Sequence, residues 1–378
     1  MPYPSIENTS AKLKGWGKTV FFLNLIAAFA LLATQISSRI SPEKFWPAEF
    51  MANSYPAAFL LNILFLLYWG IRRHRFFFLS AAIILIGYDK CILLYRPAIA
   101  KFDVTPPKNA FKVMSYNVRL FDLYNWSGNE KTRKSIMDFL KSEHPDILCF
   151  QEYFHCDEGA FRNNEGIAEL LSLPHKSIKY GLTTRKINHW GIATFSKYPI
   201  VREGTLFFEE GKSNFCLWSD IVKEKDTIRV YNVHLQSNHF KEKDYQFMEH
   251  ADSLMSDEEL INTKSVVRRI RKAVRLRARQ ANELRADIET CPYPVIVCGD
   301  FNDTPFSYFY QTIRGDLKDA FLEKGEGFGN TYFSLPVKFR IDYILHSDLL
   351  QTYSFHTKEV KLSDHYPITA WLSLQKEE

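Results

Sequence analysis

The stretch that decides the fold is VIVCGDFN at residues 295–302, an apolar run followed by a polar pair. Its first half is short, continuous and rich in β-branched residues, which is typical of a buried strand. Asp300 and Asn302 lie two positions apart, so an extended chain presents both on one side. We therefore predict a strand over Pro294–Cys298 that delivers two polar groups at its end.

Five other predicted strands share this design, an apolar run with a polar group at one end. They are expected over Phe111–Val118, Asp146–Phe150, Thr227–His234, Arg340–His346 and Ile368–Leu374. Taken singly, a strand-end Asn or Asp is most often a turn former, and a lone His is usually structural. Six such segments together favour one shared site. Its predicted members are Asn117, Glu152, His234, Asp300, Asn302, Asp342, Asp364 and His365.

The residue types in this set suit phosphoester chemistry. Oxygen donors without thiolates favour a hard cation, Mg²⁺ or else Mn²⁺. The six cysteines contain no CxxC pair, so they predict neither a metal cluster nor a disulfide framework. Two histidines can steady phosphate charge or move protons for an attacking water and a leaving alkoxide. A metal ion, a carboxylate base and cationic donors are what phosphoester hydrolysis requires.

In this order, the six segments resemble the endonuclease/exonuclease/phosphatase superfamily over about Phe111–Leu374. The most specific part is the pairing of GDFN at residues 299–302 with SDHYPI at residues 363–368. The resemblance implies an α/β fold for residues 111–378: a four-layer DNase I-like sandwich of two mixed sheets flanked by helices. The alternation of predicted strands with helices over Glu130–Ser142 and Gly159–Leu173 agrees with this layered architecture.

The resemblance also implies roles for the metal and the attacking water. Glu152 resembles the principal metal ligand, with Asn117 beside it and Asp364 near the metal. Asp300 resembles the residue that orients or deprotonates the water, and Asn302 resembles the one that holds it and a phosphate oxygen.

The two histidines have implied roles as well. His234 resembles the one that donates to the phosphate or the leaving group, and His365 a second one oriented by Asp342. Predicted substrate-binding residues are Asn232, Asn188 and Arg340. One departure from the DNase-like branch is that Gly181–Pro199 contains no acid to support the first histidine, which argues against simple DNase-like chemistry.

The first 95 residues predict a membrane segment. Three apolar runs, at about residues 19–36, 55–71 and 76–95, each approach the ~20 residues that a spanning helix needs. A cleaved signal peptide followed by buried helices is the alternative, but no small-residue cleavage site follows the first run. Residues 96–110 contain Pro97, Pro106 and Pro107 and predict a short linker.

Charge around these runs predicts an orientation in the plasma or inner membrane. Lysines at positions 12, 14 and 18 precede the first run, and three arginines (Arg72, Arg73 and Arg75) separate the second from the third. The positive-inside rule places both groups in the cytoplasm. Three spans would then make the catalytic domain extracytoplasmic. If the third run, which contains Asp89 and Lys90, does not cross, the domain is cytoplasmic instead.

The net charge of +5 says little about the substrate, because it is unevenly placed. Residues 1–110 hold 12 Lys and Arg against 5 Asp and Glu, and the remainder holds 36 against 38. One basic helix is predicted over Lys264–Arg285, after an acidic stretch at Glu249–Glu259. It is either a solvated outer helix or a contact for an anionic surface, with lipid headgroups favoured over nucleic acid.

We thus expect a membrane-anchored Mg²⁺-dependent phosphoesterase whose partners are the lipid bilayer and a lipid or small-molecule phosphate. A nuclease acting on DNA or RNA is the alternative, disfavoured because the catalytic part has no excess of positive charge. A catalytically dead binding domain is a third hypothesis, which the complete residue set disfavours. No protein partner is predicted.

Overall fold

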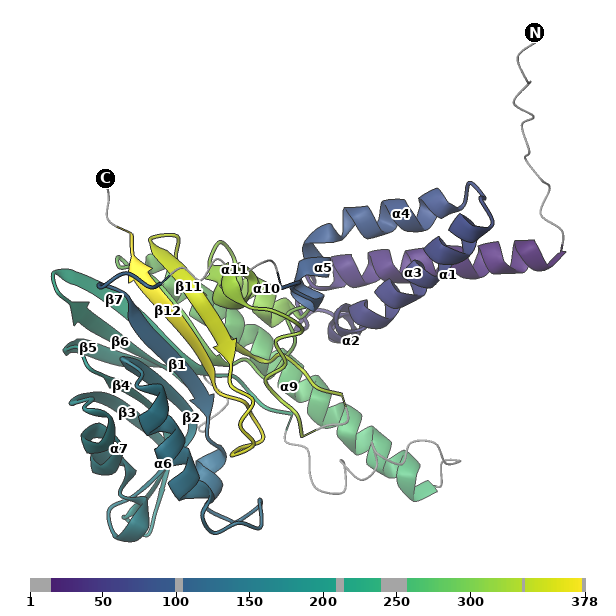
Figure 1. Cartoon of the computed structure of the whole chain (residues 1–378). Helices are drawn as coiled ribbons and strands as arrows, with labels where there is room; N and C mark the ends of the chain where they lie inside the picture. Colours follow the sequence, from purple (N-terminus) through teal and green to yellow (C-terminus); the bar gives the residue numbers. More distant parts are fainter. Residues whose placement is uncertain (1–14, 99–104, 209–213, 239–256, 335–336, 376–378) are drawn as a thin grey trace.

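The computed structural model describes residues 15–98, 105–208, 214–238, 257–334 and 337–375. Figure 1 shows a helical N-terminal module beside an α/β domain. Two of the lysines used for the predicted orientation, Lys12 and Lys14, lie outside the described residues, as does most of the acidic stretch at 249–259.

The α/β domain is built on two six-stranded mixed sheets that pack face to face (Figure 1). In spatial order, the first contains β11 (Leu350–Thr357), β12 (Ile368–Leu374), β1 (Phe111–Asn117), β2 (Ile147–Cys156), β4 (Asn188–Ser196) and β3 (His175–Thr184). The second contains β5 (Ile200–Phe207), β6 (Phe215–Lys223), β7 (Asp226–His234), β8 (Val295–Asp300), β10 (Asp342–His346) and β9 (Lys318–Asp319). The central pairs β1/β2 and β7/β8 are parallel, so each pair ends at one edge of its sheet.

Helices flank both sheets. The first sheet is covered by α6 (Thr132–Glu143) and α7 (Asn163–Leu171), and the second by α9 (Asp257–Thr290) and α10 (Tyr308–Arg314). The short helix α11 (Ala320–Lys324) packs against β11 of the first sheet and β10 of the second. Short 3-10 turns, η1 (Arg119–Asp122) and η2 (Gly159–Phe161), follow β1 and β2. The predicted architecture, two mixed sheets flanked by helices, is confirmed.

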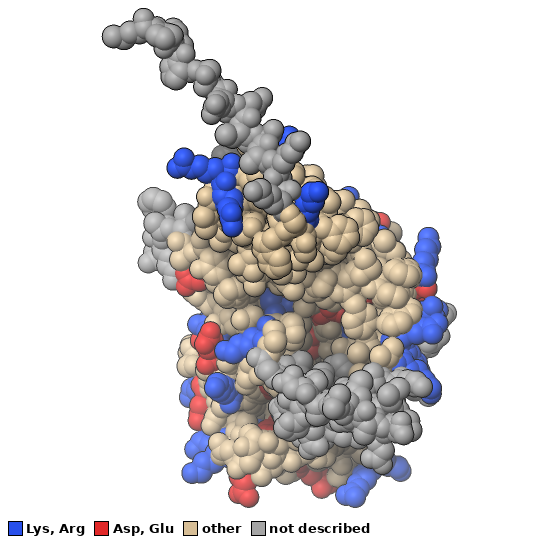
Figure 2. Space-filling view, turned by 90° about the vertical axis from the view of Figure 1, so that its right-hand side faces the viewer, with Lys and Arg blue, Asp and Glu red and all other residues tan. Residues whose placement is uncertain are grey.

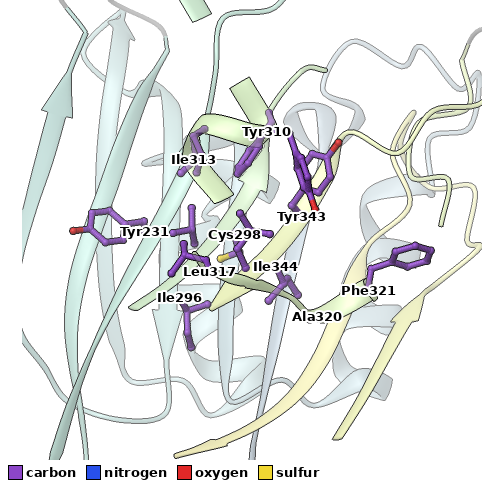
Figure 3. Close-up of a cluster of buried hydrophobic side chains, with 14 of the residues drawn as sticks. Tyr231, Ile296, Cys298, Tyr310, Ile313, Leu317, Ala320, Phe321, Tyr343 and Ile344 are labelled. Atoms are coloured by element: carbon purple, nitrogen blue, oxygen red, sulfur yellow. The ribbon is translucent and has the colours of Figure 1, made fainter. Parts of the chain in front are cut away.

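Burial of apolar side chains explains how the helices are held. On the second sheet, Ile296 and Cys298 of β8 and Ile344 of β10 pack beneath Tyr310 and Ile313 of α10 (Figure 3). These side chains are fully buried, and each such residue stabilises the fold by roughly 1.5–3 kcal/mol relative to leaving it exposed. This packing fixes the strand ends that carry the polar residues.

Gly299 is required by the close approach of β7 to β8. Its φ is +141°, and a Cβ built there would lie 2.0 Å from the carbonyl oxygen of Val233. Only glycine accepts both constraints. The glycine of the GDFN motif therefore lets Asp300 lie directly beside the end of β7.

The N-terminal module contains α1 (Gly15–Ser37), α2 (Pro47–Asn53), α3 (Tyr55–Ile71), α4 (Phe77–Ile86) and α5 (Tyr88–Leu94). Among the described residues, α1 alone is long and apolar enough to cross a membrane as one helix. The pairs α2–α3 and α4–α5 also qualify if each is one span, bent by 47° and 74°. The second and third predicted runs are thus helical, and Gly87 interrupts the third.

The module has paired polar side chains in its interior and large apolar side chains on its outer surface. Asn24 is fully buried, where it donates to Ser80 Oγ at 2.8 Å and accepts from Trp69 Nε1 at 3.0 Å. On the outer surface, Phe29 is 73% exposed and Phe78 70%. Figure 2 shows a broad tan surface in the upper part of the view, where the module lies, and mixed charge over the α/β domain below. Water favours polar side chains on the surface and apolar side chains in the interior, so this distribution of exposed apolar and buried polar side chains is the opposite.

Candidate active site

Neighbouring strands of the second sheet bring three of the predicted residues side by side. Asp300 at the end of β8 is in register with His234 at the end of β7 and with Asp342 at the start of β10. All three are buried. The predicted strand ends therefore meet at one edge of the sheet, because the parallel pair β7/β8 ends there.

The first sheet supplies the facing residues. Asn117 Nδ2 lies 3.0 Å from Asp300 Oδ2 and 3.4 Å from Glu152 Oε1, so it joins the two sheets across the site. Glu152 has φ of +48° at a break in the register between β2 and β4. A left-handed conformation at a bulge is costly for a non-glycine residue and turns the side chain out of the regular pleat. Here it aims the carboxylate into the site.

His365 lies between two carboxylates. Its Nδ1 is 2.9 Å from Asp342 Oδ2 and its Nε2 is 3.6 Å from Asp300 Oδ2. Burial alone would lower the pKa of His365, but the negative charges of Asp342 and Asp300 outweigh it and raise the pKa well above its ordinary value. His365 is therefore an imidazolium at neutral pH.

The second histidine lies near two of the same acids. His234 Nε2 is 3.9 Å from both Glu152 Oε1 and Asp300 Oδ2. This distance exceeds that of a hydrogen bond, but it leaves the imidazole facing the acidic centre.

Two carboxylates of the site, Glu152 and Asp300, have raised pKa values. Burial, Asp364 and Asp300 raise the pKa of Glu152 to about 7, against the lowering effect of His365. Burial likewise raises the pKa of Asp300, although His365 and His234 oppose the effect. Crowded acids of this kind are a reason to expect a cation among them.

The turn after β8 holds Asn302 in place. Its backbone N–H donates to Asp300 Oδ1 at 2.7 Å, and its side-chain Nδ2 donates to Leu235 O at 2.9 Å. Its φ of +56° is again left-handed. Asn302 therefore fixes one oxygen of Asp300 and leaves Oδ2 facing Asn117 and the histidines.

The SDH segment completes the site from the loop before β12. Ser363 Oγ donates to Asn117 O at 2.8 Å and lies 3.1 Å from Asp364 Oδ1. Asp364 Oδ2 lies 3.5 Å from Arg119 Nε. The Arg119 guanidinium also lies 4.6 Å from the centre of the Trp126 ring. Sequence reasoning missed Arg119, whose only signal was its position two residues after Asn117.

The three predicted substrate-binding residues lie outside this cluster. Asn232 is fully buried and joins the sheets, accepting from Gln151 Nε2 at 2.7 Å and donating to Ala193 O at 3.0 Å. Arg340 is 4% exposed, and its Nη1 donates to Asp319 at 2.7 Å. Asn188 lies opposite Cys156, beyond Glu152 along β2, and is partly exposed.

A neighbouring segment places an acid, Asp157, beside Gly181–Pro199 and next to histidines other than His234. Asp157 lies 3.2 Å from His189 Nε2 and 3.2 Å from His155 Nε2. Asp157 therefore contacts both His155 and His189, whose ring centroids lie 5.8 Å apart. Sequence reasoning did not include this pair.

The donor set fits a hard divalent cation. The carboxylates of Glu152 and Asp364 and the side-chain amide of Asn117 supply oxygen donors of the type that such a cation prefers. Burial, together with the charges of Asp364 and Asp300, raises the pKa of Glu152, and a bound cation would oppose this shift. Asp300, Asp342 and His365 also lie close enough together to hold a metal ion.

Residues 114–365 match the model of the Endonuclease/Exonuclease/phosphatase family. The chain belongs to this family. As a member, it is a hydrolase that acts on phosphoester bonds. Residues 17–92 separately match a domain of unknown function (DUF8431). No curated protein matches the chain.

Solved structures of the family share the fold. An endonuclease/exonuclease/phosphatase family protein from Bacteroides thetaiotaomicron is 17% identical with a TM-score of 0.50, over 72% of this chain and 100% of that one. The mannosyl-6-phosphatase of the same organism is 18% identical with a TM-score of 0.49, over 70% and 100%. A family protein from Beutenbergia cavernae is 17% identical with a TM-score of 0.49, over 71% and 72%. At these identities the likeness concerns the fold alone.

Proposed function

We propose that the protein is a membrane-anchored, Mg²⁺-dependent phosphoesterase that hydrolyses phosphodiester or phosphomonoester bonds by attack of water. The observation that carries the proposal is the meeting of Asp300 with Asn117, His234, Asp342 and His365. A carboxylate beside two imidazoles and an amide offers a proton acceptor, proton donors and a phosphate-binding group within one buried site.

Asn117, Glu152 and Asp364 would hold the ion, which is Mg²⁺ or, in its place, Mn²⁺. Bound there, it supplies Lewis-acid stabilisation of the phosphate charge. The support for this assignment is the all-oxygen donor set and the raised pKa of Glu152.

Asp300 is the proposed acceptor of the proton from the attacking water. Asn302 occupies its Oδ1, which leaves Oδ2 to receive the proton. Because burial raises the pKa of Asp300, its carboxylate is a stronger base than an exposed aspartate. The amide of Asn117 lies 3.0 Å from the same oxygen and is placed to orient the water or a phosphate oxygen.

The two histidines have separate proposed roles. His365, held as an imidazolium by Asp342, is the proposed donor to a phosphate oxygen, where charge develops in the transition state. His234 faces the centre from β7 and is the proposed donor to the leaving alkoxide. Of the predicted substrate contacts, partly exposed Asn188 keeps that role in the proposal, whereas buried Asn232 and Arg340 are proposed to be structural.

The apolar outer surface and polar interior of the N-terminal module support membrane anchoring. In lipid, apolar side chains face outward and polar groups pair between helices, as Asn24 does with Ser80 and Trp69. We propose three spans, formed by α1, by α2 with α3, and by α4 with α5. With the positive loop at Arg72–Arg75 inside, the α/β domain is extracytoplasmic.

A lipid or small-molecule phosphate is the proposed substrate. Basic side chains of α9 line one groove: Arg268, Arg271, Lys272, Arg275 and Arg279. The module contacts the same helix, since Arg279 Nε lies 2.6 Å from Glu43 Oε1. A cationic groove next to a membrane segment is suited to anionic headgroups.

The deciding experiment is an activity panel on the full chain in lipid nanodiscs. Release of phosphate or headgroup from phospholipids is compared with nicking of plasmid DNA, each with Mg²⁺ and with EDTA. We expect Mg²⁺-dependent release from lipid or small phosphates, and its loss in Glu152→Gln. Activity that survives both EDTA and Glu152→Gln would refute the metal mechanism, and nicking of DNA alone would favour the nuclease.

The orientation needs a separate measurement. A reporter fused after Leu374 should be active outside the cytoplasm if three spans cross the membrane. Cytoplasmic reporter activity would mean that the third run does not cross.

A further inference from the structure

Helix α2 of the N-terminal module contacts the loop that directly follows the catalytic strand β8. Asn53 Nδ2 donates to Asp303 Oδ1 at 2.9 Å, and Asn53 Oδ1 accepts from Thr304 Oγ1. Glu49 Oε2 accepts from the backbone N–H of Tyr308 at 3.2 Å. Glu49 is only 2% exposed, so the contact excludes water. The module and the loop therefore share buried polar bonds as well as a surface.

Asp303 carries this contact toward the active site. It follows Asn302, the residue that holds Asp300 Oδ1. Its second carboxylate oxygen accepts from Arg277 Nη2 at 2.8 Å, and its backbone carbonyl accepts from Tyr343 Oη at 2.9 Å. Asp303 is thus hydrogen-bonded at both carboxylate oxygens and at its backbone carbonyl. These bonds fix its conformation and thereby that of the adjacent Asn302.

Arg277 extends the network to the loop after β7. Its Nη1 donates to Gln236 O at 2.8 Å, two residues beyond His234. Asn302 Nδ2 donates to Leu235 O in the same loop. Arg277 is 1% exposed, and its guanidinium lies 5.0 Å from the centre of the Phe309 ring. A buried charge held this way is sensitive to the loss of any partner.

Apolar packing seals the same contact. The rings of Tyr55 at the start of α3 and Phe306 in the loop stack with centroids 4.9 Å apart. Tyr55 is 1% exposed and Phe306 4%. Without the module, the polar groups of Asp303 and Tyr308 and the ring of Phe306 would lose these partners.

We propose that the N-terminal module is a positioning element of the active site: Asn53 and Glu49 hold the Asp303–Tyr308 loop, and thereby Asn302 and Asp300, in the geometry that hydrolysis needs. The proposal gives a role to the segment matched only by a domain of unknown function. The expected change in hydrolysis rests on the proposed function, whereas the expected change in the structure of the loop does not. Catalysis in this protein is then tied to the folded, membrane-inserted state of the module.

The test uses the full chain in nanodiscs of phosphatidylethanolamine and phosphatidylglycerol. Two probes, bis(p-nitrophenyl) phosphate and p-nitrophenyl phosphate, report diester and monoester hydrolysis. We expect Asn53→Ala to lower kcat by about 10- to 100-fold while KM changes by less than about 2-fold, because positioning is lost and binding is not. Glu43→Gln is the matched control, since it breaks the Arg279 pair between the same module and α9 without touching the loop.

An isosteric variant separates positioning from general damage. Asn53→Asp keeps the shape of the side chain but places a carboxylate against Asp303 and Glu49. It should lower kcat at least as far as Asn53→Ala, while KM again changes by less than about 2-fold. A kcat of Asn53→Asp within about 3-fold of the wild type would contradict the proposal.

Hydrogen exchange supplies a readout that does not depend on activity. Amides of residues 300–308 and 234–238 should exchange faster in Asn53→Ala than in the wild type, and at the wild-type rate in Glu43→Gln. Unchanged exchange in Asn53→Ala, or equal acceleration in Glu43→Gln, would overturn the proposal. If the wild type hydrolyses neither probe nor any phosphate of the panel, the proposed function fails, and the exchange result still decides this inference.

Discussion

His365 Nδ1 lies 2.9 Å from Asp342 Oδ2, a contact between the loop before β12 and the first residue of β10. Strand β12 belongs to the first sheet and β10 to the second. The pair therefore joins the two sheets as well as setting the charge of the imidazole. Removal of the Asp342 carboxylate should therefore distinguish its effect on the charge of His365 from its effect on the contact between the two sheets.

Asp342→Asn should lower kcat by about 10²- to 10⁴-fold, the range for loss of a positioned acid or base. The wild-type pKa of His365 is raised, so its protonated form persists above pH 6.5. Without the carboxylate, the pKa falls toward its ordinary value, and activity should decline as pH rises through neutrality. The measurement is the pH profile of kcat for both proteins. Profiles of the same shape would show that Asp342 does not control the charge of His365.

Metal affinity should weaken as the pH falls from 8 to 6. In the metal-free protein the pKa of Glu152 is about 7, so its carboxylate is mostly ionised at pH 8 and mostly protonated at pH 6. A bound cation requires the ionised form, and its affinity should therefore fall by up to about tenfold for each pH unit below 7. Isothermal titration calorimetry of the full chain with Mn²⁺ at each pH tests this prediction. Glu152→Gln should bind weakly at every pH, and a pH-independent wild-type affinity would contradict the assignment.

The residues that the sequence identified are those whose position follows from the strands themselves. Asp300, His234 and Asp342 end or begin apolar strands, and a parallel pair must end at one edge. Two strands that were not predicted, β3 and β5, lie at sheet edges, and β3 has few buried side chains, so its apolar signal is weak. The interior strand β6 was not predicted either, although most of its side chains are buried.

Contacts between distant segments could not be predicted in this way. Asn53 and Asp303 are separated by 250 positions, and nothing in either local sequence marks the pair. Arg340 shows how packing bears on a predicted role. It was predicted to bind substrate, and in the structure it is buried, paired with Asp319, and lies 4.4 Å from the centre of the Phe321 ring. The sequence gives the chemical type of a residue, but only the packed structure shows which groups that residue contacts.

Glu143 should stabilise the fold through two lysines. Its carboxylate lies 2.6 Å from Lys112 Nζ and 2.9 Å from Lys358 Nζ, joining α6 to β1 and to the loop before β12. Burial raises the pKa of Glu143, but the hydrogen bonds from the two lysines outweigh it, and the net pKa is lowered. This stabilisation is therefore present above the ordinary pKa of about 4.5 and is lost as the pH falls through the lower folded-state value.

Glu143→Gln should lower the free energy of unfolding by about 1 kcal/mol at pH 7, after allowance for solvent screening. For a domain of this size the loss corresponds to roughly 2–4 °C in Tm. The Tm of both proteins, measured in detergent from pH 7 down to pH 3, should converge at the acidic end. A Tm difference that is constant over this range would exclude the ion pairs as its cause.

Arg119 should contribute to substrate binding more than to the chemical step. Its guanidinium lies 3.5 Å from Asp364 at the rim of the site, and its side chain is 36% exposed, so it can reach a phosphate that enters. Trp126 supports it by a cation–π contact at 4.6 Å. Arg119→Ala should therefore raise KM by about tenfold, the value of one lost charge-assisted contact, and leave kcat within about threefold. Arg162→Ala, which removes an arginine that is 60% exposed and paired with Glu165, is the control and should change neither constant. A fall in kcat at unchanged KM in Arg119→Ala would instead place Arg119 among the groups that stabilise the transition state.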